Sequence, residues 1–172
     1  IELNRLLYAL KAEGRSIVNM VIGEPDFPTP RPIVEAGIEA LRRNQIRYSP
    51  SLGTTDLRER LSQWYRSRYR IEVPASRIAV TSGSSGALLL IMGVLLSPGD
   101  EVLMADPGYP CNRHFVRAME GRAVGIPVGA DSAYQLTARL VERHWSPRTA
   151  AVMVASPSNP TGAAYTHAEL KA

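Results

Sequence analysis

The 172-residue chain is 45% hydrophobic and 21% charged, which is the balance of an ordinary globular protein and excludes a disordered or fibrous one. Its longest apolar run, from Ala87 to Leu96, is interrupted by Gly93 and is too short to cross a bilayer, so we expect a soluble protein. The formal net charge of +4 comes with interspersed acidic residues and no aromatic and basic RNA-binding motif, so we expect solvated arginine faces rather than a nucleic-acid interface.

Helices and proline-rich loops alternate in the first part of the chain. Leucines at helical spacing predict a helix over residues 1–13, which Gly14 ends. The stretch GEPDFPTPRP carries four prolines, so we expect a loop without regular structure there. Further helices are predicted over 33–43 and over about 54–69.

From Arg77 onward the pattern changes to short apolar strands that alternate with helices. Such alternation is typical of α/β folds, in which helices pack on a mostly parallel sheet. The expected fold class is therefore α/β, a three-layer sandwich with a mostly parallel sheet. Strands are predicted at 77–81, 101–105, 122–127 and 149–155, and helices at about 84–96, 111–119 and 137–145.

The turn between the first predicted strand and its helix, in VTSGSSGALLL, is a candidate seat for an anion. A helix start presents unpaired backbone N–H groups and partial positive charge, and Gly83 lets a ligand approach the backbone. Ser84 and Ser85 add hydroxyl donors, although serines here also serve as purely structural helix caps. The stretch has neither the ending of a P-loop nor the glycine spacing of a dinucleotide fingerprint, so the anion need not belong to a nucleotide.

The single cysteine, Cys111, excludes an internal disulfide. It has no cysteine or histidine partners at metal-ligand spacing, so no metal site is expected. A reducing compartment is the default for such a chain, and we expect a cytoplasmic protein.

Four loop motifs, GEPDFPTP, YSPSLG, DPGYP and SPSNPTG, occur in this order around the Gly/Ser turn. In this combination the chain resembles the fold-type I pyridoxal-phosphate enzymes, specifically the class I/II aminotransferases, over nearly all of its length. The resemblance implies that residues 1–30 form an N-terminal helix and a substrate-side loop. It also implies that residues 31–172 form the N-terminal part of the large cofactor-binding domain, with an incomplete sheet, truncated before the lysine that forms the Schiff base.

Pyridoxal 5'-phosphate is the cofactor that the resemblance implies. Gly83, Ser84 and Ser85 correspond to the cradle of the cofactor phosphate, in agreement with the argument from the helix start. Many relatives carry Asn and Lys where Ser82 and Ser85 stand in this chain, so this cradle would have hydroxyls in place of one charge.

Tyr109 and Asn159 correspond to residues that contact the cofactor ring. Tyr109, in DPGYP, matches the aromatic residue that stacks on the ring, and the alternative is a tyrosine of the core. Asn159, in SPSNPTG, matches the asparagine that donates to the ring oxygen, and the alternative is an ordinary turn asparagine before proline. The resemblance also makes the Asn159–Pro160 bond a candidate for the cis form.

Two residues of the N-terminal loops correspond to other contacts of the family. Gly23 matches the glycine whose backbone faces the substrate carboxylate, and the alternative is a simple turn glycine. Tyr48 matches a tyrosine that reaches the cofactor phosphate of a neighbouring subunit, and the alternative is a surface tyrosine. The resemblance therefore implies a homodimer with shared active sites.

The Schiff-base lysine of the family has no counterpart in these residues. Lys11 stands in the first predicted helix and Lys171 at the end of the chain, and neither matches, so no catalytic residue is assigned. The groups that pair with the pyridine nitrogen and clamp the substrate carboxylate are also missing, and Asp106 is not one of them because it belongs to DPGYP. We expect the 172 residues alone to be inactive. In the family the first strand pairs with the last and the second to fourth lie together, so strand 77–81 would lack its neighbour.

The implied function is that of part of a pyridoxal-phosphate-dependent aminotransferase, which moves an amino group between an amino acid and a 2-oxo acid. No nucleic-acid or membrane partner is expected. Two alternatives stay open: a lyase of the same fold, such as a carbon–sulfur lyase, and an aminotransferase-like sensor domain of a transcription regulator. The preferred amino acid is not specified, because the side-chain pocket and carboxylate clamp are mostly missing.

Overall fold

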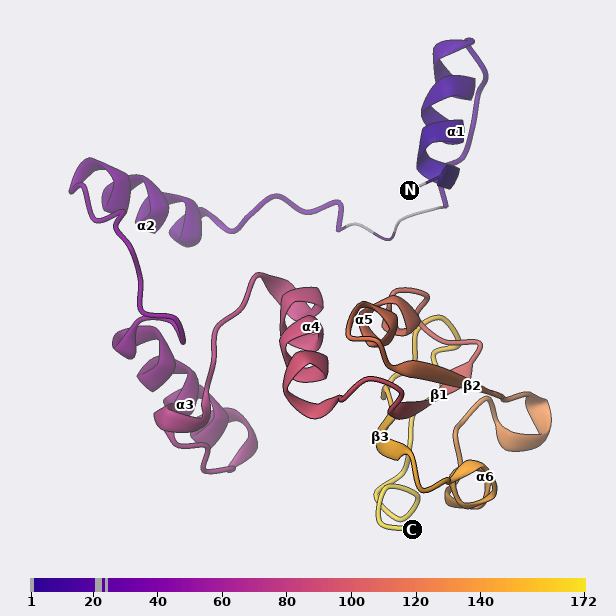
Figure 1. The fold of residues 1–172 in the computed structure, drawn as a ribbon. Helices are drawn as coiled ribbons and strands as arrows, with labels where there is room; N and C mark the ends of the chain where they lie inside the picture. Colours follow the sequence, from indigo (N-terminus) through magenta and orange to yellow (C-terminus); the bar gives the residue numbers. More distant parts are fainter. Residues whose placement is uncertain (1, 21–22, 24) are drawn as a thin grey trace. The chain divides into compact units, whose positions relative to one another are not determined.

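The computed structural model describes residues 2–20, 23 and 25–172 (Figure 1). Contacts within the chain divide it into two compact units, Ile1–Ser49 and Pro50–Ala172. The boundary after residue 30, which the family resemblance implies, stays a prediction.

In the unit Ile1–Ser49, two helices are joined by a segment whose described residues have no regular structure. The helix α1 (Glu2–Ala12) buries Leu7, and Gly14 follows its end at φ +82°. The helix α2 (Arg31–Arg42) begins before the predicted residue 33. Its early start includes Pro32, because a helix leaves the N–H groups of its first turn unpaired and a proline there costs nothing.

The unit Pro50–Ala172 alternates helices and strands as predicted. Its helices confirm the predicted segments to within a few residues at each end. None of the helices that the structure describes is long and apolar enough to span a membrane. In chain order its elements are α3 (Thr55–Tyr69), η1 (Ala75–Arg77), α4 (Gly83–Leu95), β1 (Glu101–Asp106), α5 (Asn112–Ala118), β2 (Arg122–Pro127), η2 (Ala130–Ser132), α6 (Ala138–His144) and β3 (Thr149–Met153).

The three strands form a parallel sheet in the order β2-β1-β3. The central strand β1 pairs with β2 along its whole length, from Glu101 opposite Arg122 to Asp106 opposite Pro127. Its pairing with β3 is irregular after Glu101 and ends at Met104 opposite Met153. The prediction that the second to fourth predicted strands lie together is confirmed.

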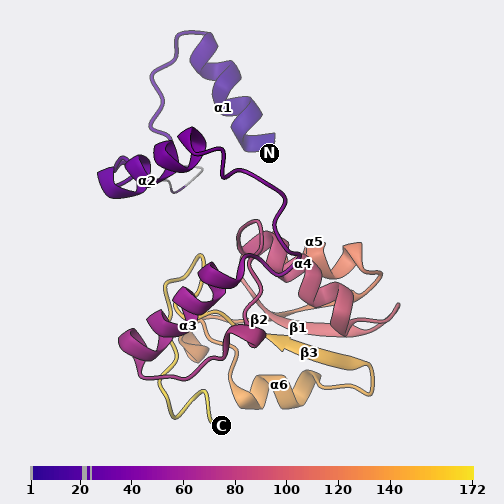
Figure 2. The same cartoon turned by 90° about the vertical axis from the view of Figure 1, so that its left-hand side faces the viewer.

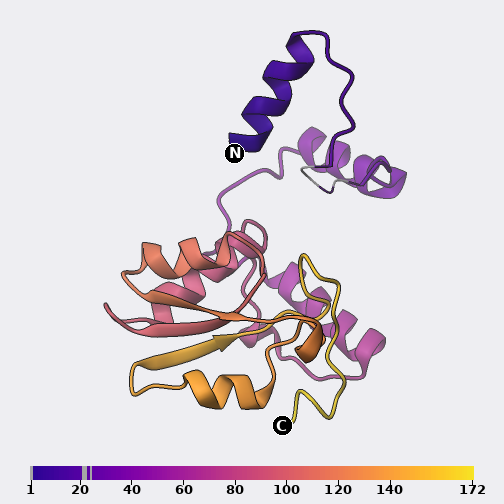
Figure 3. The ribbon, with the colours of Figure 1, turned by 90° about the vertical axis from the view of Figure 1, so that its right-hand side faces the viewer.

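Helices cover both faces of this sheet, with α4 and α5 on one face and α6 on the other (Figures 2 and 3). Because side chains alternate along a strand, β1 sends Val102 toward the first pair of helices and Leu103 toward α6. Val102 packs with Met92 and Val116, and both Val102 and Leu103 are fully buried. This is the three-layer α/β architecture predicted from the alternating pattern.

The helix α4 is apolar on nearly every side but is covered on only one. Met92 is 3% exposed and packs into the core, whereas Leu90 and Val94 are 62% and 84% exposed. A helix that is apolar all round is normally buried all round. The outward side of α4 is therefore a large exposed apolar surface of this unit.

The prediction of a strand at 77–81 is wrong. Residues 75–77 form the short helix η1, and residues 78–81 join no ladder among the strands that the structure describes. The backbone groups of this segment bind elsewhere: the Val80 N–H donates to the Leu52 carbonyl at 3.0 Å, and Arg58 Nε donates to the Ile78 carbonyl at 2.8 Å. With no strand beside it, an apolar segment satisfies its polar groups with loops and side chains instead.

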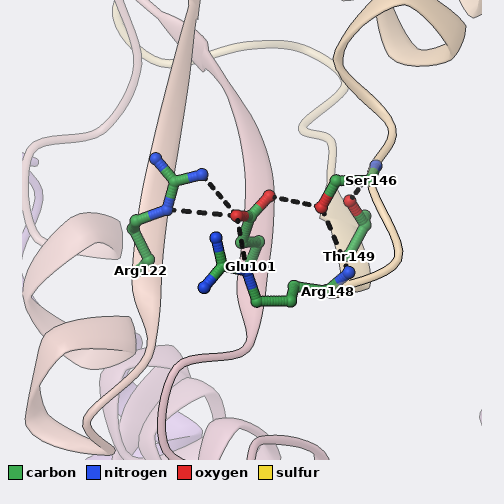
Figure 4. Close-up of polar contacts among 5 residues, drawn as sticks. All are labelled: Glu101, Arg122, Ser146, Arg148 and Thr149. Carbon is green, nitrogen blue, oxygen red and sulfur yellow. Dashed lines mark hydrogen bonds and ion pairs between the residues drawn. The ribbon is translucent and has the colours of Figure 1, made fainter.

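At the amino-terminal ends of the strands, the buried carboxylate of Glu101 joins all three of them (Figure 4). Glu101 begins β1 and is 2% exposed. Arg122, at the start of β2, donates from Nε at 3.1 Å and also from Nη2 to Oε1, and Ser146 Oγ donates to Oε2 at 2.9 Å. Arg148 Nε, just before β3, lies 3.7 Å from Oε1.

These donors compensate the loss of water around the Glu101 carboxylate. The hydrogen bonds from Arg122, followed by that from Ser146, lower the pKa of Glu101 below its ordinary value of 4.5, against the opposing effect of burial. The carboxylate is therefore charged at neutral pH and fixes the starts of β1, β2 and β3 relative to one another. We call Glu101, Arg122, Ser146 and Arg148 the Glu101 cluster.

Candidate functional site

A hollow of about 470 Å³ lies at the opposite, carboxyl-terminal ends of β1 and β3. Ligand sites of open parallel sheets form at this edge, and the volume is in the range of small-molecule sites. Its wall combines the first turns of α4, the ends of two strands, the start of α5 and the loop after β3. The lining residues are Ser84, Leu88, Met104, Ala105, Gly108, Tyr109, Asn112, Arg113, Met153, Val154, Ala155, Ser158 and Asn159.

The start of α4 contributes Ser84 to this wall. Gly83 begins the helix at φ +72°, and a Cβ there would have no atom within 4 Å, so the space beside it is open. No side chain caps this helix start, and within the described part of the chain neither Ser84 nor Ser85 has a side-chain hydrogen bond. The serines therefore do not act as caps, which was the alternative for this turn. Gly83 and Ser85 adjoin Ser84 in sequence but do not line the hollow.

The loop DPGYP places Tyr109 in the wall. The turn requires glycine at 108, because a Cβ there would lie 2.6 Å from the Ala105 carbonyl oxygen. Tyr109 is 40% exposed, so it is not a core tyrosine. Its contact with Cys111 raises the pKa of the Tyr109 phenol above 10.0, so the phenol is protonated at neutral pH.

The loop SPSNPTG places Asn159 in the wall after β3. The Asn159–Pro160 bond is cis as expected, and the Asp106–Pro107 and Ser156–Pro157 bonds are cis as well. Ser158 closes the loop, since its N–H donates to the Ala163 carbonyl at 2.8 Å and its carbonyl accepts from Gly162 N at 2.7 Å. Among the described residues, no group is hydrogen-bonded to the side-chain amide of Asn159.

Sequence reasoning missed Ser158, in the SPSNPTG loop, and two further polar residues of the wall, Asn112 and Arg113, at the start of α5. Arg113 Nη2 lies 3.5 Å from Asp106 Oδ1. Asn112 Oδ1 is the one buried side-chain polar atom among the described residues that has no hydrogen-bond partner. Their position two or three residues after the DPGYP loop was the available signal, because a helix that follows a strand end begins at the ligand edge of a parallel sheet.

Gly23 and Tyr48 belong to the other unit, Ile1–Ser49. Both are exposed, and a Cβ on Gly23 would meet no atom within 4 Å. Their roles at the substrate and at a neighbouring subunit stay predictions.

The donor set of the hollow fits a flat, aromatic, anionic ligand. Ser84 and the uncapped helix start can bind an anion, Tyr109 can stack on a ring, and Asn159 can donate to a ring oxygen. Leu88, Met104 and Met153 supply the apolar surface that such a ring needs. Pyridoxal phosphate has these features, so the residues present fit it.

The comparisons with known proteins agree on one family. The family described as aminotransferase class I and II matches residues 15–172. A (5-formylfuran-3-yl)methyl phosphate transaminase of Methanocaldococcus jannaschii is 37% identical over 91% of this chain and 40% of its own length. A probable aspartate/prephenate aminotransferase of Aquifex aeolicus is 37% identical over 94% of this chain and 41% of its own length.

A comparison with solved structures agrees with the sequence comparisons. The crystal structure of an aspartate aminotransferase from Rhizobium meliloti superposes with a TM-score of 0.92 at 32% identity, covering 99% of this chain and 42% of that one. The chain thus spans about 40% of the length of the curated relatives it matches.

Proposed function

The chain belongs to the class I and II aminotransferase family, and on this premise we propose that it is part of an enzyme that moves an amino group between an amino acid and a 2-oxo acid. The family is generally dependent on pyridoxal phosphate, and we propose this cofactor for the present protein. The observation that carries the proposal is the hollow itself, in which Ser84, Tyr109 and Asn159 come together from distant parts of the sequence.

The start of α4 is proposed to hold the cofactor phosphate. Gly83 leaves open space beside the helix start, Ser84 lines the hollow, and Ser85 follows in the same turn. Backbone N–H groups at a helix start and free hydroxyls are both suitable donors to a phosphate. The absence of a side-chain cap supports this role, since a ligand anion would then take the position of the cap.

Tyr109 and Asn159 are proposed to orient the cofactor ring. A protonated Tyr109 ring can stack on a heteroaromatic face, and the unpaired amide of Asn159 can donate to the ring oxygen. When bound, the cofactor supplies an electron sink that stabilises the carbanion formed next to the amino nitrogen. The role of this stretch of chain is to bind and orient the group and to keep water from its apolar side.

The remaining groups of the reaction are proposed to come from outside this stretch. Neither Lys11 nor Lys171 matches the lysine that binds the cofactor in the family, so this part of the chain assigns no catalytic residue. We propose that Gly23 faces the substrate carboxylate, and that Tyr48 reaches the phosphate of a second subunit in a homodimer.

The test uses the full-length protein. We expect a visible absorption band when pyridoxal phosphate is added, and amino transfer from an amino acid to 2-oxoglutarate. The variant Ser84→Asp places a like charge at the proposed phosphate seat and is expected to weaken cofactor binding by about tenfold or more. The matched variant Ser67→Asp, at an exposed serine of α3, is expected to bind the cofactor as the wild type does.

Three outcomes would count against the proposal. A full-length protein that binds no cofactor would remove its basis. Equal cofactor affinity in Ser84→Asp and the wild type would remove the phosphate seat from α4. Release of pyruvate and ammonia without any amino acceptor would favour the lyase over the aminotransferase.

A further inference from the structure

The loop after β3, which brings Asn159 into the wall of the hollow, has no regular structure. Two hydrogen bonds within it join Ser158 to Ala163 and to Gly162, at 2.8 and 2.7 Å. These bonds shape the tip of the loop, but they do not attach it to the rest of the unit. The contacts that attach the loop therefore decide where Asn159 lies.

Three hydrogen bonds attach the end of this loop to the segment between η2 and α6. The hydroxyl of Tyr165 donates to the Leu136 carbonyl at 3.2 Å and accepts from the Leu136 N–H at 2.9 Å. Gln135 Nε2 donates to the Ala164 carbonyl at 2.6 Å. The partners are 29 residues apart in the sequence, so these bonds form only in the folded chain. We call Gln135, Leu136, Ala164 and Tyr165 the Tyr165 cluster.

The segment that receives these bonds is part of the core. Leu136 is 4% exposed and packs with Leu103 and Ile126 on the α6 side of the sheet. Gln135 is 7% exposed, so its side-chain amide is also buried. The loop after β3 is thus attached to a densely packed part of the unit, which has little freedom to move.

The polar groups of this segment depend on Tyr165. Within the described part of the chain, Tyr165 is the partner of both backbone groups of Leu136. A buried N–H or carbonyl without a partner is costly, so these groups hold the Tyr165 hydroxyl in one position. The Tyr165 N–H donates in turn to Ser156 Oγ at 3.0 Å, and this bond joins the two ends of the loop.

Asn159 does not position itself, because its amide has no hydrogen-bond partner among the described residues. A binding group held in place before the ligand arrives avoids the cost of ordering it on binding. Tyr165 and Gln135 do not line the hollow, so they can act on a ligand only through the loop.

We propose that Tyr165 and Gln135 are positioning residues, which hold the loop after β3 so that the Asn159 amide faces the hollow before a ligand binds. This inference rests on the proposed function for the identity of the ligand. It adds to it the residues that orient the proposed donor to the cofactor ring.

The experiment compares Tyr165→Phe with the wild type in the full-length protein. The change removes the hydroxyl and keeps the ring. Titration with pyridoxal phosphate, followed by its absorption band, is expected to give a dissociation constant about fivefold higher, because the loop must then be ordered on binding. Hydrogen–deuterium exchange without cofactor is expected to become several-fold faster at residues 156–165 and to stay unchanged in β1.

The pH dependence of the absorption band gives a readout that a merely structural role would not change. Donation from Asn159 favours the ionised form of the ring oxygen, so its loss raises the pKa of that oxygen. The pH midpoint of the band is therefore expected to rise in Tyr165→Phe, in the same direction as in Asn159→Ala. An unchanged midpoint in Tyr165→Phe, together with a raised one in Asn159→Ala, would overturn the proposal.

The double variant tests whether Tyr165 acts through Asn159. If it does, adding Tyr165→Phe to Asn159→Ala changes the cofactor dissociation constant by less than about twofold, because the amide to be oriented is already gone. If the two losses of affinity multiply, Tyr165 acts independently of Asn159 and the proposal is overturned.

The matched control is Tyr134→Phe. Tyr134 precedes Gln135 in the same segment and is exposed, and no group among the described residues is hydrogen-bonded to its hydroxyl. This variant is expected to bind the cofactor and to exchange its loop amides as the wild type does.

Gln135→Leu keeps the proposal testable if Tyr165→Phe does not fold. It removes the donor to the Ala164 carbonyl, and Ala164 is exposed, so water can replace the lost bond. We expect a dissociation constant for the cofactor about threefold higher than in the wild type. Wild-type affinity in every variant of the Tyr165 cluster that folds would overturn the proposal, as would exchange that becomes faster over the whole unit Pro50–Ala172.

The outcomes also separate this inference from the proposed function. A protein in which Asn159→Ala weakens cofactor binding but Tyr165→Phe does not would keep the proposed function and lose the positioning role. A full-length protein that binds no cofactor would overturn the proposed function, whereas faster exchange confined to residues 156–165 in Tyr165→Phe would still support the attachment of the loop.

Discussion

The two ends of the three-stranded sheet treat polar groups in opposite ways. At the amino-terminal end, the Glu101 cluster surrounds a buried carboxylate with polar groups from two segments, the start of β2 and the loop before β3 (Figure 4). At the carboxyl-terminal end, the amide of Asn159 has no partner among the described residues, Asn112 Oδ1 is buried without one, and Arg113 is held only at 3.5 Å.

This difference indicates that the starts of the strands serve the stability of the sheet, whereas the ends of the strands serve ligand binding. Satisfied polar groups fix the strand starts, and unsatisfied ones at the strand ends remain available to a ligand. Polar groups left unpaired in a native structure are costly, and they are expected where binding compensates the cost. The comparison can be tested by changing one end and measuring properties of the other.

The largest effect is expected from Glu101→Gln in the full-length protein. An amide cannot accept the same charged hydrogen bonds from Arg122, and the arginines are left without their counter-ion. We expect the melting temperature to fall by roughly 10 °C. Cofactor affinity, measured from the absorption band below the melting temperature, is expected to stay as in the wild type.

Glu142→Gln is the matched control for this change, since Glu142 is exposed on α6. It is expected to leave the melting temperature nearly unchanged. Equal effects of the two variants would show that the Glu101 cluster does not stabilise the sheet.

Lowering the pH is expected to weaken the Glu101 cluster, at the same end of the sheet. Because the pKa of Glu101 is lower in the folded protein than its ordinary value of 4.5, its contribution to stability is complete above about pH 4.5 and is lost as the pH falls through the folded value. The melting temperatures of the wild type and Glu101→Gln, measured between pH 7 and pH 3, are expected to converge below pH 4.5. A constant difference over this range would contradict the assignment.

A smaller effect, of the opposite kind, is expected from Asn159→Ala. The change removes the proposed donor to the cofactor ring, so we expect cofactor affinity to fall by about tenfold. The side chain has no partner among the described residues, so the melting temperature without cofactor is expected to stay within about 2 °C. Gln63→Ala, at an exposed amide of α3, is the control for both measurements.

The smallest effect is expected from Asn112→Leu. Replacing a buried acceptor that has no partner by an apolar group of similar size removes a desolvation cost, so the free energy of unfolding is expected to rise by about 1 kcal/mol. Urea denaturation of the full-length protein measures it. A loss of stability would mean that Asn112 Oδ1 is hydrogen-bonded in solution, for example to water.

The sequence predicted the parts of the fold that local patterns determine. The strand at 122–127 coincides with β2, and the helix predicted over 84–96 corresponds to α4, because apolar periodicity and turn residues define both. The prediction of a strand at 77–81 was wrong. Its short apolar pattern is compatible with a strand, but a strand forms only where a neighbouring strand pairs with it. Pairing is a tertiary property that the segment does not encode.

The candidate site was likewise predicted only where local sequence motifs mark its loops. Ser84, Tyr109 and Asn159 were selected because their loops carry recognisable motifs, and all three line the hollow. Their roles stay proposals. Asn112 and Arg113 were missed, because helical spacing gives the faces of a helix without telling which face meets a cavity.

The parallel order β2-β1-β3 has a consequence for how such a protein can diversify. All three strands run in the same direction, so the loops that follow them lie at one edge of the sheet. The Glu101 cluster lies at the opposite edge. Insertions, deletions or grafted segments in the loops after the strands can therefore alter which compounds such a scaffold binds without disturbing the Glu101 cluster. The contacts that hold the strands together and the loops that surround the hollow thus lie at opposite ends of one sheet.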